Sequence, residues 1–346
     1  MHLEQQIAQL LLVGFKGDGL LPHSTLAADL RDLNLGGVIL FDRLLAERPP
    51  DNNIRSAEQT TRLCTQLQDC AGGELLIAVD QEGGMVSRFK ADRGFPVTAS
   101  AGLLGRATPA DTAASAAVTA GMLAGLGINL NLAPVVDLDL ERDNPIIGRY
   151  ERSFSADPAA VCLHAGAWID AHRQRGILSC LKHFPGHGSS VADSHLGFVD
   201  ISDSWREEEL IPYRTLIGSG KADMVMIGHL FNRRLDPLLP ATLSPAVIGG
   251  LLRRDLGFTG VVITDDMQMR AITDRYGLVQ ACVAALTAGA DIIIVGNNLE
   301  YDPLIVRKLV TGIMEAVRQG RLSEDRIGEA WQRVRLLKHQ LTRKVV

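Results

Sequence analysis

The segment richest in reactive side chains spans residues 182–195, with the sequence KHFPGHGSSVADSH. It holds one lysine, three histidines and one aspartate directly after an apolar run. Imidazole and carboxylate groups are common zinc ligands, so a metal site is one interpretation. Its candidate ligands are His183, His187, Asp193 and His195. Against it, Pro185, Gly186 and Gly188 exclude the helix on which two histidines four residues apart bind one ion. We therefore expect no metal.

The end of this segment, Asp193-Ser194-His195, favours proton transfer. In an extended loop, side chains two residues apart point the same way, so the carboxylate can approach the imidazole and orient it. The motif predicts His195 as a general acid and base near neutral pH, with Asp193 as its partner. An Asx turn beside a solvated histidine is the alternative for such a motif standing alone.

Residues 260–269, GVVITDDMQM, run from an apolar stretch straight into two aspartates. A partly desolvated carboxylate at the end of a strand can act as a nucleophile or a base. Because adjacent side chains in an extended segment face opposite ways, Asp265 and Asp266 are not expected to share a role.

Two further segments carry groups suited to a sugar. Asp80 follows an apolar run and can accept hydrogen bonds from hydroxyl groups, and Arg88 can donate one. Residues 144–154 bring Arg149 and Arg152 toward the same region. For these arginines, ion pairing at the surface is the alternative.

Eight short apolar runs must position these side chains. They are residues 11–15, 37–41, 75–79, 128–132, 177–181, 224–227, 261–263 and 292–295. Helix-like stretches such as residues 113–126, 158–175 and 279–288 separate them. Continuous apolar strands alternating with helices are typical of a parallel sheet covered by helices. We predict an α/β fold, a single (β/α)8 TIM-type barrel over residues 1–346, with a C-terminal helix starting near Ser323 and no second domain.

Polar residues repeatedly follow the apolar runs, which supports the barrel. They are Asp80, Asp137, His183, His229, Asp265 and Asn297. In a TIM barrel the loops after all eight strands converge on one end, and that end carries the active site.

Composition narrows the function classes. Hydrophobic residues make up 46% of the chain and charged residues 22%, which excludes a disordered chain. The net charge of −5 argues against a nucleic-acid partner. No signal-peptide pattern and no membrane-spanning apolar run is found, and the five cysteines form no CxxC pair. A cytoplasmic enzyme without a membrane partner is expected.

The motifs together resemble those of the family 3 glycoside hydrolases, and within them the bacterial β-N-acetylglucosaminidases of cell-wall recycling. The resemblance spans nearly the whole chain. It rests on VDQEGG with Arg88 after it, NLAPVVDL, ERSF, KHFPGHG followed by ADSH, GVVITDDMQM and GRLSEDRI. KHFPGHG with DSH is the most specific of these motifs.

The resemblance implies roles for individual residues. Asp265, rather than Asp266, corresponds to the nucleophile, and His195 with Asp193 corresponds to the acid/base pair. The implied contacts to the sugar in the −1 position are Asp80, Arg88, Arg152, Lys182 and His183. No cofactor or metal is implied.

Two features depart from the family pattern. Met85 stands where relatives often have arginine, which puts the leaving-group preference in doubt. The polar loop of residues 42–56 is longer than expected for the compact bacterial enzymes, and we expect it to lie over the barrel mouth or to be partly mobile.

The expected function is the release of terminal, non-reducing β-linked N-acetylglucosamine from muropeptides by a retaining mechanism. A phosphorylase with the same covalent intermediate is an alternative, because a neutral histidine repels phosphate less than a carboxylate does. A β-glucosidase or a β-xylosidase is a second alternative. A sugar-binding protein without catalytic activity is the alternative that is not an enzyme. The sequence does not determine the oligomeric state.

Overall fold

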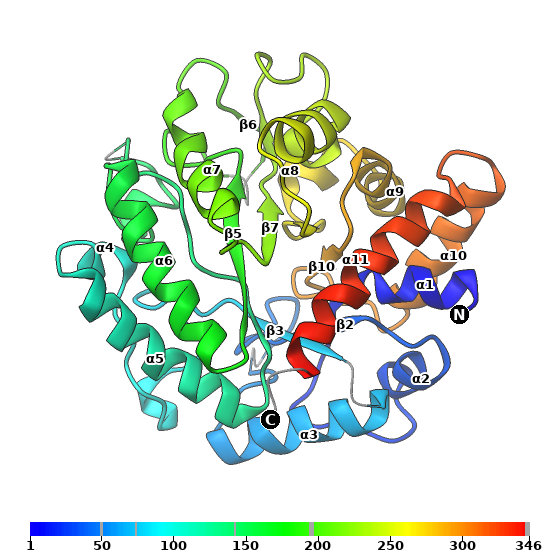
Figure 1. The fold of residues 1–346 in the computed structure, drawn as a ribbon. Coiled ribbons are helices and arrows are strands. Elements are labelled where there is room, and N and C mark those ends of the chain that lie inside the picture. The colour runs from blue at the N-terminus through cyan, green and yellow to red at the C-terminus, as the bar shows by residue number, and fades with distance from the viewer. Residues whose placement is uncertain (49–50, 73–74, 142, 194–196, 343–346) are drawn as a thin grey trace.

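A computed structural model describes residues 1–48, 51–72, 75–141, 143–193 and 197–342. These residues form a barrel of parallel strands surrounded by helices (Figure 1). No helix in these ranges is long and apolar enough to cross a membrane.

The barrel confirms the predicted α/β class. Its eight strands, in spatial order β10-β1-β2-β3-β4-β5-β7-β9, are all parallel. They are β1 (Leu11–Gly14), β2 (Gly37–Ile39), β3 (Leu76–Val79), β4 (Leu130–Asn131), β5 (Leu178–Phe184), β7 (Met224–Ile227), β9 (Val261–Thr264) and β10 (Ile293–Val295). A parallel bridge between Ile263 and Ile292 joins the last two strands. Each strand overlaps one of the predicted apolar runs, and β5 extends three residues beyond its run, to Phe184.

The strands read as continuous apolar runs because both of their faces are buried. All the residues of these eight strands are buried, as expected for a parallel sheet that is covered on its outside and filled on its inside. Close approach of neighbouring backbones requires a glycine at the end of β1. A Cβ atom on Gly14 would lie 1.7 Å from the carbonyl oxygen of Gly296.

The helices of the outer layer include the stretches predicted at residues 113–126, 158–175 and 279–288, although the first of them begins at Pro109. They are α1 (Leu3–Gln9), α2 (Thr25–Asp32), α3 (Ala57–Ala71), α4 (Ala101–Leu104), α5 (Pro109–Leu126), α6 (Pro158–Gln174), α7 (Ile211–Gly218), α8 (Arg270–Thr273), α9 (Leu278–Ala288), α10 (Ile305–Arg318) and α11 (Glu324–Thr342). Helix α5 begins at a capping box formed by Thr108 and Asp111 and ends at Gly127, whose φ is 83°. Asp157 caps α6 in front of Pro158.

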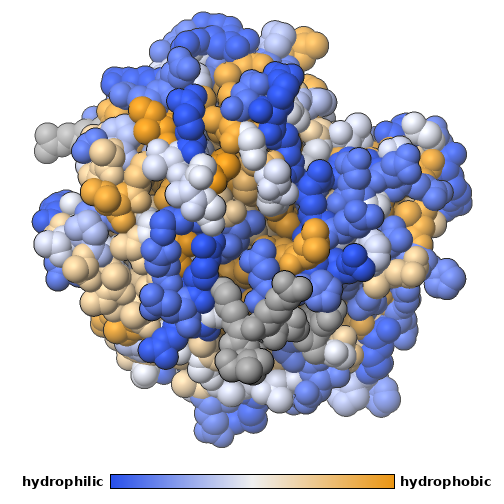
Figure 2. Space-filling view, viewed as in Figure 1, coloured by the Kyte–Doolittle hydropathy of each residue, from blue (hydrophilic) through white to orange (hydrophobic). Residues whose placement is uncertain are grey.

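The C-terminal helix α11 is present as predicted and lies beside α1 across the barrel (Figure 1). Lys338 of α11 donates to Gln9 of α1 at 2.8 Å. Arg326 and Arg333 pair with the fully buried Asp291, just before β10. The same side of the molecule is largely hydrophilic with smaller hydrophobic patches (Figure 2).

A second small sheet and a π-helix were not predicted. Strands β6 (Val199–Asp200) and β8 (Leu230–Phe231) form a second, two-stranded parallel sheet in the loops after β5 and β7. The connection between β7 and β9 contains a π-helix, η5 (Ala246–Asp255). Two-residue strands carry too little periodicity to be recognised in a sequence.

Candidate active site

Seven of the eight predicted site residues meet in a cavity of about 350 Å³ at the C-terminal ends of the barrel strands. It is lined by Asp80, Glu82, Met85, Val86, Arg88, Ile146, Tyr150, Arg152, Lys182, His183, Asp193, Met226 and Asp265. The polar residues come from the ends of β3, β5 and β9 and from the loops after β3, β4 and β5. We call it the charged pocket.

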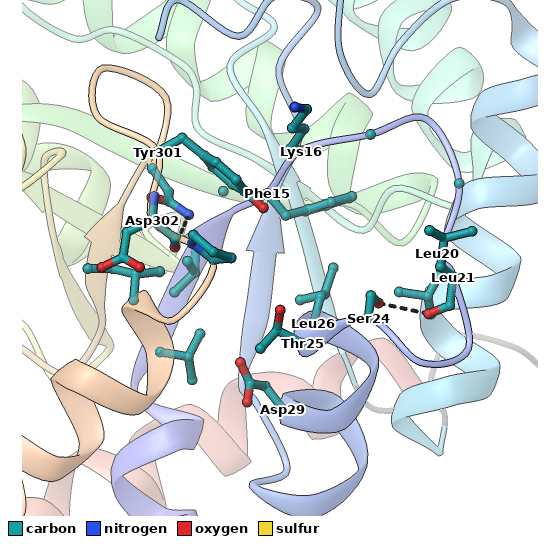
Figure 3. A pocket seen from close by; sticks show the side chains of 18 of the residues that line it. Phe15, Lys16, Leu20, Leu21, Ser24, Thr25, Leu26, Asp29, Tyr301 and Asp302 are labelled. Atoms are coloured by element: carbon teal, nitrogen blue, oxygen red, sulfur yellow. Dashed lines mark hydrogen bonds between the residues drawn. The ribbon is translucent and has the colours of Figure 1, made fainter. Parts of the chain in front are cut away.

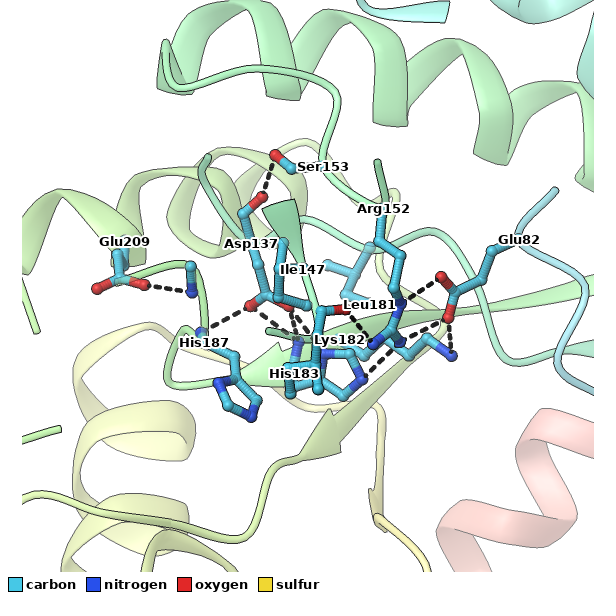
Figure 4. A network of polar contacts seen from close by, with 12 residues as sticks. Glu82, Asp137, Ile147, Arg152, Ser153, Leu181, Lys182, His183, His187 and Glu209 are labelled. Atoms are coloured by element: carbon cyan, nitrogen blue, oxygen red, sulfur yellow. Dashed lines mark hydrogen bonds and ion pairs between the residues drawn. The ribbon is translucent and has the colours of Figure 1, made fainter. Parts of the chain in front are cut away.

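One wall of the charged pocket is a network of ion pairs around Glu82 (Figure 4). Arg152 binds both carboxylate oxygens of Glu82, with two distances of 2.8 Å. The ammonium of Lys182 lies 2.7 Å from Glu82 and 2.9 Å from Asp80. The guanidinium of Arg88 approaches the other oxygen of Asp80 at 3.6 Å. This wall therefore presents fixed acceptors and donors, which suits a ligand rich in hydroxyl groups.

The charges of this wall stabilise one another despite burial. Burial alone would raise the pKa of Glu82, but Arg152 and Lys182 outweigh it and hold that pKa well below its ordinary value. Burial opposes the charge of Lys182 as well, yet Asp80 and Glu82 keep its pKa above the ordinary value. The side chains of Glu82 and Lys182 are only 5% and 3% exposed, so removing one partner would leave an uncompensated buried charge.

His183 is oriented by a carboxylate beneath it. Its Nδ1 lies 2.7 Å from Asp137, which also accepts the backbone N–H groups of His183 and His187 (Figure 4). Burial would raise the pKa of Asp137, but the contact with His183 lowers it on balance. The Nε2 of His183 lies 3.3 Å from Arg152, which joins this pair to the ionic wall.

The side chains of Asp265 and Asp266 have different partners, as expected. Asp265 lines the charged pocket, and one of its carboxylate oxygens accepts the backbone N–H of Asp266 at 2.8 Å. The Asp266 carboxylate accepts the backbone N–H groups of Gln268 and Gly296, at 3.0 and 2.9 Å. The Nε2 of His229 donates to the carbonyl oxygen of Asp266 at 2.9 Å, and its Nδ1 lies 2.8 Å from the hydroxyl of Thr242, which fixes the turn. Asp266 thus fixes the backbone conformation of the turn from which Asp265 reaches the charged pocket.

Of the predicted acid/base pair, Asp193 lines the charged pocket. His195 lies outside the described residues, so its distance from Asp193 and Asp265 stays a prediction. Within the described ranges, no group of three or more His, Cys, Asp and Glu side chains is arranged to hold a metal ion.

The segment before Asp193 is fixed by the buried carboxyl of Glu209, which is 1% exposed. Glu209 accepts hydrogen bonds from Ser189 at 2.6 Å and from the N–H of Gly188 at 3.0 Å. Burial raises the pKa of Glu209 to about 7, although these hydrogen bonds oppose the rise. A Cβ on Gly186 would lie 2.7 Å from the Glu209 side chain, and one on Gly188 would lie 1.7 Å from a carbonyl oxygen. The glycines of KHFPGHG are therefore required by close packing.

A second cavity, of about 300 Å³, continues from the charged pocket. The two share Asp80, Arg88, Met226 and Asp265. Its other lining residues are Ile39, Phe41, Leu45, Leu132, Asp266, Met269, Ile294, Asn298 and Leu299. Because most of these are aliphatic or aromatic, we call it the apolar pocket.

The loop of residues 42–56 reaches this apolar pocket, as predicted, through Leu45. Asn298 accepts the backbone N–H groups of Leu45 and Ala46, through its side chain at 2.8 Å and its carbonyl at 2.9 Å. At the other end of the loop, Asn52 and Asn53 are buried and donate to the carbonyl oxygens of residues 15 and 17. The loop is therefore fixed at both ends over the barrel mouth.

A third cavity, of about 440 Å³, lies between the loop after β1, helix α2 and the start of α10 (Figure 3). Its polar side chains include Lys16, Asp29 and Tyr301. None of the predicted site residues lines it. Asp29 is buried there in an ion pair with Arg307, at 2.9 Å.

The structure thus brings together seven of the eight predicted site residues: Asp80, Arg88, Arg152, Lys182, His183, Asp193 and Asp265. Arg149, considered with Arg152, is exposed and does not line the pocket. Sequence reasoning missed Glu82 as a site residue. It also gave no role to Asp137. The signal for both was present, since Glu82 lies two residues after Asp80 and Asp137 follows an apolar run.

The family model for the glycosyl hydrolase family 3 N terminal domain matches residues 2–337. A beta-hexosaminidase of Tolumonas auensis is 40% identical over 276 residues, which cover 78% of this chain and 78% of that protein. A beta-hexosaminidase of Alkalilimnicola ehrlichii is 34% identical over 320 residues, covering 89% of this chain and 86% of that protein.

Solved structures give the same grouping. A family 3 beta-N-acetylglucosaminidase from Paenibacillus superposes with a TM-score of 0.89 at 32% identity, covering 99% of this chain and 63% of that one. The present chain therefore spans less than two thirds of the Paenibacillus protein. A beta-N-acetylhexosaminidase from Beutenbergia cavernae gives a TM-score of 0.85 at 29% identity, covering 98% of this chain and 99% of that one.

Proposed function

Because the chain belongs to glycoside hydrolase family 3 and is a β-hexosaminidase, we propose that it removes terminal, non-reducing β-linked N-acetylglucosamine with retention of configuration. The observation that carries the proposal is that Asp265 lines the same pocket as the ionic wall of Asp80, Glu82, Arg152 and Lys182. A nucleophilic carboxylate and a hydroxyl-binding wall in one pocket are the two parts that a retaining exo-glycosidase requires.

In the proposed reaction, the hydroxyl groups of the sugar bind Asp80, Arg88, Arg152, Lys182 and His183. Asp265 attacks C1 and forms a glycosyl ester while the bond from C1 to the leaving oxygen breaks. His195 gives its proton to that oxygen, and Asp193 orients the imidazole. In the second step His195 takes a proton from water, the water oxygen bonds to C1, and the Asp265 carboxylate is released.

Most retaining glycosidases use two carboxylates about 5 Å apart. An imidazole in place of the second carboxylate relaxes that charge pattern, because only one of the two groups then carries a negative charge. Glu209 accepts hydrogen bonds from Gly188 and Ser189, at 3.0 and 2.6 Å, and so fixes the backbone a few residues before Asp193.

We propose muropeptides as the natural substrates, the cytoplasm as the compartment and a single domain over residues 1–346 as the organisation. The compartment is supported by the five cysteines, none of which forms a disulfide. The substrate is supported by the resemblance to bacterial enzymes of cell-wall recycling.

A panel of p-nitrophenyl β-glycosides, assayed with and without phosphate, tests the activity. We expect release of p-nitrophenol from the N-acetylglucosaminide at least about tenfold faster than from the glucoside or xyloside, because a site built around one substituent rejects an analogue that lacks it. The sugar product should be free N-acetylglucosamine in both buffers. N-acetylglucosamine 1-phosphate as the main product would establish the phosphorylase instead, and no turnover with any glycoside would leave a binding protein.

A further inference from the structure

We propose that the exposed side chains of Met85 and Tyr150, at the rim of the charged pocket, bind the leaving group of the scissile bond through an uncharged face of its ring. We call these two side chains the rim pair. The ligand class is an N-acetylglucosaminide whose leaving group presents a ring without charge beside the glycosidic oxygen. This inference rests on the proposed function, since it assigns the part of the substrate beyond C1.

The first argument is the direction in which the leaving group departs. The nucleophile and the proton donor of a retaining glycosidase flank the scissile bond, so the leaving oxygen lies opposite Asp265 and toward the acid/base pair. Asp193 of that proposed pair lines the charged pocket and does not line the apolar pocket. Met85 and Tyr150 likewise line only the charged pocket. The leaving group therefore belongs on the side of Asp193 and the rim pair.

The second argument is that the rim pair reaches solvent. A leaving group larger than a few atoms must extend from C1 out of the pocket. Met85 is 68% exposed and Tyr150 is 36% exposed, whereas other described lining residues that are not among the proposed sugar contacts are buried. The buried ones are Glu82, Ile146 and Met226. A group that leaves the pocket on this side consequently passes the rim pair.

The third argument is that an ion pair joins the two turns that carry the rim pair. Glu82 lies three residues before Met85, and Arg152 lies two residues after Tyr150. Arg152 binds both carboxylate oxygens of Glu82, at 2.8 Å each. The ionic wall that receives the sugar thus also sets the separation of the two side chains above it.

A serine contacts both turns on their outer side. The turn of residues 82–86 is closed by two backbone hydrogen bonds to one carbonyl oxygen, at 3.0 and 3.1 Å. A Cβ on Gly84 in this turn would lie 2.7 Å from the Cβ of Ser100. The Ser100 hydroxyl donates to the carboxylate of Glu151, the neighbour of Tyr150, at 2.8 Å. The rim pair is therefore carried by turns that are fixed to each other.

The fourth argument is the chemistry of this side of the pocket. Each arginine and lysine among the described lining residues is already ion-paired with a carboxylate, at 2.7–3.6 Å. These cations are Arg88, Arg152 and Lys182. The rim pair carries no charge, and the carboxylate of Asp193 disfavours an anion beside it. A thioether and a phenol ring instead offer polarisable apolar surface, which packs against the face of a ring.

The test compares methyl and benzyl β-N-acetylglucosaminides, whose leaving alcohols have similar acidity and differ by an uncharged ring. We expect kcat/KM to be about tenfold higher for the benzyl glycoside, the effect of removing roughly 55 Å² of apolar surface from water. In Met85→Ser and Tyr150→Ser the ratio of the two kcat/KM values should fall toward one. Both side chains reach solvent, so the variants are expected to fold.

Two controls match Met85→Ser in exposure. Leu163 is 63% exposed on α6 and lines neither pocket, and Leu45 is 61% exposed and lines the apolar pocket. Leu163→Ser and Leu45→Ser should both keep the wild-type ratio. A ratio that falls in Leu45→Ser and not in the two rim variants would overturn the proposal, because the leaving group would then contact the apolar pocket.

A 4-carboxybenzyl glycoside tests the preference for an uncharged ring. Its kcat/KM should be about threefold or more below that of the benzyl glycoside, and Met85→Arg should narrow the difference, because it supplies a cation at the rim. Equal kcat/KM for methyl and benzyl glycosides, or for benzyl and carboxybenzyl glycosides, would overturn this proposal while the proposed activity stands. Failure to hydrolyse any of these glycosides would overturn the proposed function and this proposal with it.

Discussion

The two sides of the barrel mouth are built on opposite principles. On the side of β3 to β5, the buried Glu82 binds the buried Lys182 at 2.7 Å and the partly buried Arg152 at 2.8 Å. On the side of β9, β10 and the 42–56 loop, the lining is apolar and Leu45 and Leu299 reach solvent. The charged side cannot rearrange without exposing an unpaired buried charge, whereas the apolar side tolerates change. The comparison indicates that the orientation of the sugar is fixed by the ionic wall, whereas the apolar side imposes no fixed charge on what it contacts.

The largest expected effect comes from the carboxylate between the two sides. Asp265→Asn should lower kcat by about 10³-fold or more, because the amide cannot form the glycosyl ester while the sugar contacts remain. Steady-state hydrolysis of p-nitrophenyl N-acetylglucosaminide measures this. Asp266→Asn is the control, since asparagine keeps an oxygen that can accept the N–H of Gly296. A nearly inactive Asp266→Asn beside a nearly normal Asp265→Asn would reverse the assignment.

The next effect separates the two chemical steps. His195→Ala should lower the rate on alkyl glycosides by about 10²- to 10⁴-fold and on aryl glycosides with acidic phenols far less, because a good leaving group departs without a proton. Azide, which needs no deprotonation, should speed turnover of the activated substrate. Asp193→Ala should show a weaker form of the same pattern. An equal loss with all leaving groups and no azide effect would remove His195 from the acid/base role.

The ionic wall should be sensitive to loss of its central anion. Glu82→Gln should lower the free energy of unfolding by about 3–5 kcal/mol, because Arg152 and Lys182 lose their shared partner in a buried site. Urea denaturation measures this. Glu58→Gln removes an exposed pair with Arg62 on α3 and should cause no measurable change. Similar stability of the two variants would mean that the wall is not held by these pairs.

A smaller effect is expected from Glu209. Its pKa is raised by burial to about 7, so its contribution to stability is complete below pH 4.5 and is lost as the pH rises through 7. The free energy of unfolding of the wild type should fall over this range, relative to Glu209→Gln, by at most about 3 kcal/mol. Urea unfolding of both proteins between pH 4.5 and 8 tests this. The exposed Glu207→Gln should parallel the wild type, and parallel curves for Glu209→Gln as well would exclude the raised pKa.

The sequence predicted the parts of this molecule that depend on local pattern. Buried parallel strands read as apolar runs, and the side chains after them converge because all eight strands point the same way. Asp80, His183 and Asp265 were predictable for that reason. Glu82 was missed although it lies two residues after Asp80, because its role comes from Arg152, which lies 70 residues away. The fixed position of the 42–56 loop likewise depends on Asn298, which is 253 residues from Leu45.

The most direct test of the central claim is to trap the intermediate with 5-fluoro-N-acetylglucosaminyl fluoride, whose slow second step lets the glycosyl-enzyme accumulate. Intact-protein mass spectrometry should show one added sugar per chain, and peptide mapping should place it on Asp265. Asp265→Asn should not be labelled. A label on Asp266, or turnover with inversion and no label at all, would contradict the account.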